Sequence, residues 1–168
     1  MRKDSATKWT KGTILAIEDD PGDREIMRRA LRGEGYRVDL FTVADGNQAL
    51  DYLFRRGCYA DPSSSPRPDL ILLDLNLPGI DGKKVLEVVK DDEDLCTIPI
   101  VIVTTSIRDR DVFECYRLGC NSYTVKPLEA HAFIEAVHDL CSYWLGAVTL
   151  PRHDRSPEPG GTRIQHTQ

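Results

Sequence analysis

The sequence predicts an α/β fold in which a doubly wound, five-stranded parallel sheet carries helices on both faces. Five short segments typical of strands alternate with five segments whose apolar residues recur at helical spacing, and this alternation is typical of a parallel sheet. The third strand segment, between Asp69 and Asp74, reads Leu-Ile-Leu-Leu without a polar residue. Such a run is expected for a strand that is buried on both faces.

Composition and charge restrict the class of protein. The chain has 168 residues and a formal net charge of -5, which suits one domain with tails and argues against sequence-independent binding of nucleic acid. No apolar run approaches the roughly 20 residues that a membrane-spanning helix needs. The charged N-terminus has no apolar segment behind it, so no signal peptide is expected and a cytoplasmic location is predicted.

Five cysteines are present, and no two of them form a Cys-x-x-Cys pair. An odd number without such a pair predicts reduced thiols that act as small hydrophobic residues. A zinc site built from Cys115, Cys120 and a histidine is an alternative, but their spacing matches no common ligand pattern.

The first strand and helix follow an N-terminal segment that is rich in polar residues. Residues 1–12 are predicted to form a flexible arm, and residues 13–17 the first strand. Asp20 precedes Pro21, a residue favoured in the first turn of a helix, so Asp20 is expected to cap this helix. Glycines at 33 and 35 should end it.

A second strand and helix come next, and a long loop follows them. Residues 36–43 form the predicted strand, and Asp45 is expected to cap the helix with Gln48 three residues on. The helix should end near Gly57. Residues 58–68 are rich in Pro and Ser and are long for a connection between a helix and a strand. This loop is either a solvated insertion or a contact for a partner.

The second half of the chain repeats the alternation three times. Its expected strands are at 69–74, 100–103 and 121–125. Helices are expected at 81–92, after the fourth strand as far as Gly119, and from about 129 to 145. The helix that stops at Gly119 carries Val112, Cys115 and Tyr116 on one face. Residues 13–151 therefore form the predicted domain. The polar segment 152–168 is predicted to be a disordered tail.

Four of the five predicted strands end in polar residues that suit one chemistry. These are Glu18, Asp19 and Asp20 after the first, Asp74 after the third, Thr104 and Thr105 after the fourth, and Lys126 after the fifth. In a parallel sheet they lie along one edge, where ligands bind. Clustered carboxylates repel, by about 1 kcal/mol per pair at 4 Å in water, unless a cation compensates. Oxygen ligands of this kind suit Mg²⁺, and Asp74 is then positioned to accept a phosphoryl group.

This constellation resembles the receiver domain of two-component response regulators, over residues 13 to about 145. The resemblance implies a flavodoxin-like fold with strand order 2-1-3-4-5. It also implies that Asp74 is the phosphoacceptor. Asp19 would ligate Mg²⁺ directly, Glu18 through water, and the backbone carbonyl of Asn76 would complete the metal site with Asp74.

Three further residues receive roles from the same resemblance. Lys126 would pair with a phosphoryl oxygen, Thr104 would be the switch hydroxyl that turns toward the phosphoryl group, and Tyr123 the aromatic residue that moves with it. The resemblance also implies a cis peptide bond before Pro127 and a position at Ser106 that tunes phosphoryl lifetime. Taken singly, Lys126 also fits a surface lysine, Thr104 a strand-forming residue, and Tyr123 ordinary core packing.

Two segments resemble a smaller group, the response regulators that serve bacterial phytochrome histidine kinases. They are the Pro-Arg-Pro-Asp-Leu sequence at 66–70 and the stretch 143–151. The resemblance implies a homodimer formed partly through the last helix and the extension after it. Trp144 could instead be a core residue. The apolar run 147–150 has no obvious core to enter, which suggests an interface. No second folded domain is expected after the last helix, so the chain reads as a stand-alone receiver.

The leading hypothesis is therefore a signalling module and not an enzyme. A histidine kinase, or a histidine phosphotransfer protein, would phosphorylate Asp74 and change partner binding. A receiver of a different kinase, either chemotaxis-like or an intermediate in a relay, is an alternative. A Mg²⁺-dependent phosphohydrolase that uses an aspartyl-phosphate needs a second acid near its nucleophile, which Leu75 and Asn76 do not supply. A binding module that no longer accepts phosphate is the third alternative, and the intact site argues against it.

Overall fold

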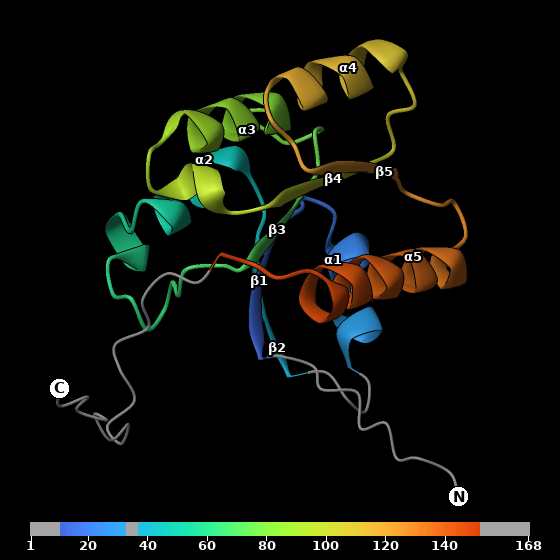
Figure 1. Ribbon diagram of the computed structural model, residues 1–168, viewed down its shortest axis with the longest axis horizontal. Coiled ribbons are helices and arrows are strands. Elements are labelled where there is room, and N and C mark those ends of the chain that lie inside the picture. Colours follow the sequence, from blue (N-terminus) through green and yellow to red (C-terminus); the bar gives the residue numbers. More distant parts are fainter. Residues whose placement is uncertain (1–10, 33–36, 152–168) are drawn as a thin grey trace, which may run out of the picture.

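A computed structural model describes residues 11–32 and 37–151, which form one five-stranded parallel sheet flanked by helices (Figure 1). The strand order is β2-β1-β3-β4-β5, as the resemblance implied. The strands are β1 (Gly12–Ile17), β2 (Val38–Val43), β3 (Leu70–Leu73), β4 (Ile100–Thr104) and β5 (Ser122–Val125). The helices are α1 (Pro21–Leu31), α2 (Gly46–Leu53), α3 (Gly82–Asp91), α4 (Asp109–Arg117) and α5 (Ala130–Ser142).

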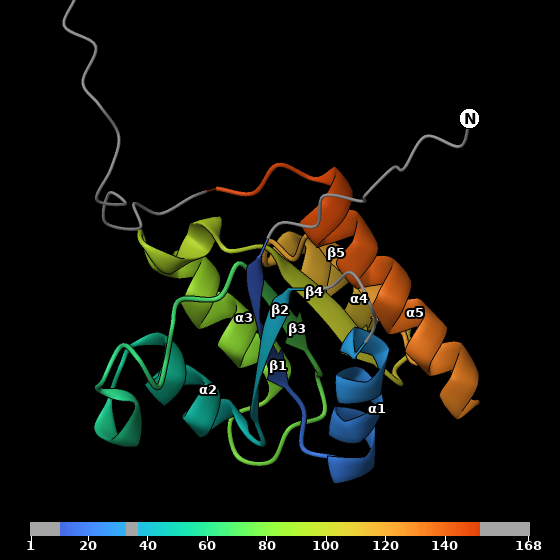
Figure 2. The same ribbon diagram turned by 90° about the horizontal axis from the view of Figure 1, so that it is seen from below.

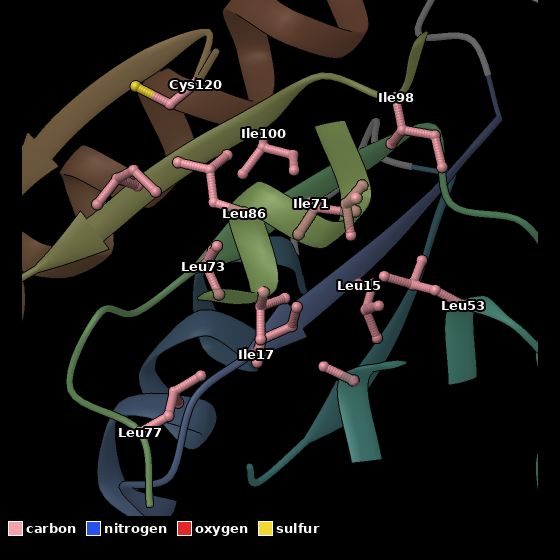
Figure 3. Close-up of a cluster of buried hydrophobic side chains, with 14 of the residues drawn as sticks. Leu15, Ile17, Leu53, Ile71, Leu73, Leu77, Leu86, Ile98, Ile100 and Cys120 are labelled. Atoms are coloured by element: carbon pink, nitrogen blue, oxygen red, sulfur yellow. The ribbon is translucent and has the colours of Figure 1, made fainter. Parts of the chain in front are cut away.

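The sheet has one hydrophobic core on each face. Helices α1 and α5 pack side by side on one face, and α2, α3 and α4 cover the other (Figures 1 and 2). Side chains alternate along each central strand, so that Ile71 and Leu73 enter the core under α2 and α3, whereas Leu70 and Leu72 enter the core under α1 and α5. Figure 3 shows the first of these cores. All four residues of β3 are fully buried, as the unbroken apolar run predicted.

Aspartate side chains cap three of the helices. Asp20, Asp45 and Asp81 each accept a hydrogen bond from the backbone N–H three residues on, at the start of α1, α2 and α3. The side chain of Gln48 completes the cap of α2 by accepting a bond from the backbone N–H of Ala44. These contacts satisfy N–H groups that have no partner within a helix. The caps at Asp20 and Asp45 confirm the sequence prediction.

The start of α3 lies against the end of β3, next to Asp74. A Cβ atom on Gly82 would come 2.1 Å from the backbone oxygen of Asp74 and 2.6 Å from Leu75 Cα. No side chain fits at that distance, so glycine is required here. This close approach fixes where the chain leaves the strand, and with it where the Asp74 carboxylate lies.

The Pro- and Ser-rich loop is held to the domain by specific hydrogen bonds. Tyr52 in α2 donates its hydroxyl proton to the carbonyl of Pro66 at 2.8 Å. Ser65 is 1% exposed and donates to the carbonyls of Tyr59 and Asp61. The loop also contains a short helix, η1 (Gly57–Tyr59). The loop is thus attached to the domain at these points, while residues 60–64 are exposed to solvent.

Along α4, Cys115 is fully buried whereas the neighbouring Tyr116 is 50% exposed. Two expectations for the second half of the chain are wrong. Helix α5 ends at Ser142, and a π-helical turn, η3 (Tyr143–Ala147), continues the chain. The apolar run after it does meet a core: Leu150, with Trp144, is partly buried against the cluster under α1 and α5.

Some expectations fall outside the part of the chain that the structure describes. Residues 1–10 of the predicted arm, Tyr36 of the second strand and the tail at 152–168 lie there. Gly12, which was assigned to the arm, already belongs to β1. Within residues 11–32 and 37–151, no helix has the length and apolarity to cross a membrane.

Candidate functional site

The polar residues predicted to share one edge of the sheet are brought together there. Glu18 follows β1, Asp74 follows β3, Thr104 ends β4 and Lys126 follows β5. All four are at least nine-tenths buried, which is unusual for such side chains. Asp19, beside Glu18, is exposed. The edge therefore combines a buried charged group with an acid that is open to solvent.

Lys126 is the centre of this group. Its Nζ lies 2.6 Å from Glu18 Oε2, 2.9 Å from Asp74 Oδ2 and 2.8 Å from Asp23 Oδ2. The three ammonium protons thus have three carboxylate acceptors. A surface lysine would remain in water, so the alternative reading of Lys126 from the sequence is wrong.

Burial and these ion pairs act on the proton affinities in opposite directions. Burial raises the pKa of Glu18 to about 7, although the hydrogen bond from Lys126 lowers it. For Lys126, burial opposes the charge, but hydrogen bonds to Asp23, Glu18 and Asp74 outweigh it and raise the pKa above the ordinary lysine value. Lys126 is therefore a permanent cation in this site.

Three of the carboxylates suit a divalent cation. Oxygens of Glu18, Asp19 and Asp74 lie within 4.8 Å of one another. Among the described residues this is the single group of three or more acidic, histidine or cysteine side chains with such spacing. One lysine leaves the cluster with excess negative charge, and hard oxygen ligands favour Mg²⁺ or Mn²⁺. The residues present thus fit the predicted metal.

The loop that carries the two acids is held by its neighbours. Arg24 Nη1 donates to the backbone carbonyls of Glu18 at 2.7 Å and Asp19 at 2.9 Å. Glu18 Oε1 also accepts a bond from the backbone N–H of Asp20 at 3.1 Å. Since Glu18 Oε2 contacts Lys126, both oxygens of this carboxylate already have protein partners. The loop conformation is therefore set before any ligand arrives.

The hydroxyl groups expected to act as a switch lie beside the acidic cluster. Thr104 Oγ1 accepts from the backbone N–H of Ser106 at 3.4 Å and from Asn76 Nδ2 at 3.5 Å. The backbone N–H of Asn76 donates to Asp74 Oδ1 at 3.2 Å. Tyr123 donates its hydroxyl proton to the Ser106 carbonyl at 2.9 Å. The β4–α4 loop thus links the site to β5.

A set of ion pairs continues from this loop to the outer helices. The Ser106 hydroxyl donates to Asp111 in α4, and Lys83 in α3 pairs with both Asp111 and Glu114. Hydrogen bonds to Asp111 and Glu114 raise the pKa of Lys83 to about 12. Helix α4 is therefore attached to α3 and to the loop after β4 by the same acidic side chain.

The structure does not support two expectations from the sequence, a cis peptide bond and a zinc site. The bond before Pro127 is trans, because the described residues contain no cis peptide, so the implied cis bond is wrong here. Cys115 and Cys120 are buried free thiols, and burial raises the pKa of each to about 11. Among the described residues neither cysteine belongs to a group of three or more potential metal ligands, which argues against the zinc alternative.

Asp23 and Arg24 are site residues that the sequence argument missed. Both lie in the first turns of α1, directly after the acidic loop. Their position in the sequence was the signal that could have found them. A helix that starts four residues after the end of a strand must place its first turn at the same edge of the sheet. The contact between Asp23 and Lys126 cannot be predicted from sequence spacing, because the two residues are 103 positions apart in the chain.

The comparisons with known proteins agree with this geometry. The model of the response regulator receiver domain matches residues 14–138. The chain belongs to the response regulator receiver domain family. Response regulator Rcp1 of Synechocystis sp. is 39% identical over 138 residues, which are 82% of this chain and 92% of that protein.

Two solved structures are similar over nearly their whole length. One is the phosphorylated cyanobacterial phytochrome response regulator RcpA, with a TM-score of 0.81, 38% identity and coverage of 85% of this receiver and 100% of that chain. The other is the Mn²⁺-bound form of Rcp1, with a TM-score of 0.79, 38% identity and coverage of 84% and 99%. The family places this receiver among signalling proteins rather than catalysts of a separate reaction.

Proposed function

We propose that this receiver is switched by phosphorylation of Asp74. The observation that carries the proposal is the contact of Lys126 Nζ with Asp74 Oδ2 at 2.9 Å inside a buried acidic cluster. A carboxylate oxygen of Asp74 would form a bond to phosphorus while the P–N bond of a donor phosphohistidine breaks. The imidazole leaves with the electron pair of that bond. Lys126 stays protonated and stabilises the transferring oxygens.

The acidic cluster is proposed to hold Mg²⁺ during this reaction. Glu18, Asp19, Asp74 and the backbone carbonyl of Asn76 would be the residues that hold it. Bound Mg²⁺ supplies positive charge for the phosphoryl oxygens. Support comes from the 4.8 Å spacing of three carboxylate oxygens and from the similar receiver Rcp1, which has been solved with Mn²⁺.

The response to phosphorylation is proposed to pass through Thr104 and Tyr123. Thr104 would turn toward the phosphoryl group, and Tyr123 would follow through Ser106, whose carbonyl accepts its hydroxyl proton. The surface that would change is made by α4, β5 and α5. It exposes apolar side chains that a partner could cover, among them Phe113 at 65%, Val125 at 42% and Leu128 at 101%.

The phosphodonor is proposed to be a phytochrome-type histidine kinase in the cytoplasm, acting directly or through a histidine phosphotransfer protein. Support comes from the similarity to RcpA, a phytochrome response regulator. Transfer to Asp74 should be compared between purified phytochrome-type and other histidine kinases at equal concentration. Faster transfer from the phytochrome type is expected, and equal rates would contradict this assignment.

A homodimer through α5, η3 and the extension that follows is proposed as well. Tyr143 at the start of η3 is 58% exposed, and its ring meets that of Trp144 edge-on at 5.4 Å. Light scattering should be compared for the wild type, Trp144→Ala and a truncation after Leu145. We expect a dimer that both changes weaken. A monomer mass for the wild type would end the idea.

The central test is direct labelling of Asp74. The protein is incubated with Mg²⁺ and acetyl phosphate, and its mass is measured. The wild type should gain one phosphoryl group, whereas Asp74→Asn should gain none. Asp81→Asn is the matched control, because asparagine still caps α3. Equal labelling of wild type and Asp74→Asn would reject the acceptor, and steady turnover of p-nitrophenyl phosphate would favour a phosphohydrolase.

A further inference from the structure

Asp23 is the one partner of Lys126 that lies outside the acidic cluster. Its Oδ2 is 2.8 Å from Lys126 Nζ, and its side chain is 27% exposed against 5% for the lysine. Glu18 and Asp74, the other two partners, both belong to the group of carboxylates with oxygens within 4.8 Å of one another. Asp23 therefore contacts the cation of the site without sharing in the cluster.

The three carboxylates that contact Lys126 therefore have different roles during phosphorylation. A cation at the cluster draws on the oxygens of Glu18 and Asp74, and phosphorylation converts Asp74 into an acyl phosphate without its carboxylate charge. Neither event changes Asp23. Its carboxylate is the acceptor that remains for the Lys126 ammonium throughout, and an ion-paired hydrogen bond of this kind is strong.

Both ends of the Asp23–Lys126 pair are fixed by secondary structure. The backbone N–H of Asp23 donates to the capping side chain of Asp20 at 2.8 Å, at the start of α1. The backbone N–H of Lys126 donates to the Thr104 carbonyl at 2.8 Å, beside the end of β4. The flexible four-carbon side chain of the lysine is thus the longest mobile part of this link. Asp23 restrains it from the side of α1.

We propose that Asp23 is a positioning residue for phosphoryl transfer, which holds the Lys126 ammonium over Asp74 when Glu18 and Asp74 are engaged by cation and phosphoryl group. The proposal rests on the proposed function. With acetyl phosphate as donor, a bond forms between an Asp74 oxygen and phosphorus, the bond from phosphorus to the acetyl oxygen breaks, and acetate leaves with that electron pair. Lys126 transfers no proton in this step. The contribution of Asp23 is therefore to position the Lys126 ammonium group.

The first test measures the initial rate of Asp74 phosphorylation by acetyl phosphate over a Mg²⁺ series. Removal of one charged hydrogen bond in Asp23→Ala should lower the rate at saturating Mg²⁺ about tenfold. The Mg²⁺ concentration at half-maximal rate should stay within about threefold, because Asp23 is outside the cluster. Asp23→Asn, whose amide oxygen still accepts from the ammonium, should lose less. Glu25→Gln removes an equal charge from α1 without touching Lys126, and should match the wild type.

The second test needs no phosphodonor. A held ammonium group exchanges its protons slowly enough to give a ¹H–¹⁵N NMR signal, and that of Lys126 is assigned by its absence in Lys126→Arg. In the Mg²⁺-free protein, where Glu18 and Asp74 also hold the ammonium, the signal should be present in the wild type, Glu25→Gln and Asp23→Ala. At saturating Mg²⁺ it should persist in the wild type and in Glu25→Gln, and be lost or broadened in Asp23→Ala. Thermal melts accompany every variant, and Asp23→Asn takes the place of Asp23→Ala should the latter not fold.

The outcomes separate this proposal from the proposed function. A wild-type rate in Asp23→Ala, or a Lys126 signal that is unchanged in this variant at saturating Mg²⁺, overturns the positioning role while Asp74 remains the acceptor. A fall in apparent Mg²⁺ affinity that accounts for the whole loss of rate overturns it too. If the wild type takes up no phosphoryl group, both proposals fail together.

Discussion

At the scale of single residues, burial decides which side chains take part in chemistry. Lys126 and Glu18 are buried together, so that each compensates part of the cost of burying the other's charge. The three buried cysteines are surrounded by apolar side chains instead, and lie on strand-facing or core positions. The same loss of water that strengthens the ion pair makes these thiols unreactive.

The exposed and buried cysteine thiols should therefore react with alkylating agents at different pH values. Burial raises the pKa of Cys115 and Cys120 to about 11, so at pH 8 about one in a thousand of each is thiolate. Exposed Cys58 should be alkylated by iodoacetamide first, as measured by peptide mass mapping, and Cys115 and Cys120 only as pH approaches 11. Because the folded-state pKa is raised, the stability from these neutral thiols is complete below pH 9 and is lost as pH rises through 11. Alkylation of Cys115 as fast as Cys58 at pH 8 would contradict this prediction.

The acidic site also shows how far residues could be assigned from the sequence. Asp74 was predictable because it directly follows an apolar run that indicates a buried strand, and Lys126 because it directly follows the last of the five predicted strands. Asp23 was not, because its partner lies far along the chain and the first turn of a helix has acids for many reasons. The topology of a parallel sheet brings the ends of its strands to one edge. Whether a side chain on a neighbouring helix reaches that edge depends on its direction from the helix, which the sequence pattern does not give.

At the scale of elements, the starts of α1 and α2 were readable from the sequence, whereas the end of α5 was not. The aspartate caps announce α1 and α2 through local hydrogen bonds that involve residues three apart. The end of α5 has no such signal: its apolar spacing continues through η3, where Leu145 and Trp144 still pack on the core. Tyr116 illustrates a second limit, since one residue of rotation on α4 separates the buried Cys115 from an exposed ring. The apolar periodicity of a helix predicts which face is buried, but not which residues lie at the border of that face.

The junction between β3 and α3 should tolerate substitution poorly. A methyl group on Gly82 meets backbone atoms at 2.1 and 2.6 Å. Gly82→Ala should therefore lower the free energy of unfolding by about 3 kcal/mol, and slow phosphorylation because Asp74 is displaced. Urea denaturation measures the first effect and acetyl phosphate labelling the second.

A glycine in the first turn of α1 provides the matched control. A Cβ on Gly22 meets only the flexible carboxylate of Asp20, at 2.9 Å. Gly22→Ala should therefore change stability by about 1 kcal/mol or less. If both alanine variants were equally stable, the close approach at Gly82 would not matter for the fold.

At the scale of the whole molecule, four acids and one lysine leave the carboxyl edge of the sheet negative. The repulsion among Glu18, Asp19 and Asp74 opposes folding, and a bound cation relieves it only in the native state, where the three oxygens are within 4.8 Å. Ligands that bind only the folded state stabilise it by mass action. Metal binding and global stability are therefore linked in this receiver.

Magnesium should therefore raise the melting temperature. At a concentration of 100 times its Kd, the gain in free energy of unfolding is about 2.7 kcal/mol. Scanning calorimetry with MgCl₂, and with NaCl at the same ionic strength, separates binding from screening. EDTA should reverse the effect, and Asp19→Asn should reduce it. An equal rise in Asp19→Asn and wild type would place the ion elsewhere.

The alternation of side chains along β1, β3 and β4 has a consequence for how such a protein can diversify. With neighbouring positions of β3 packed into opposite cores, hardly any residue of the central strands is free to vary without disturbing packing on one side or the other. Change is tolerated instead on the outer surfaces of the helices and on the connections, away from the shared interior. New recognition surfaces can arise there while the chemistry at the strand ends is inherited intact.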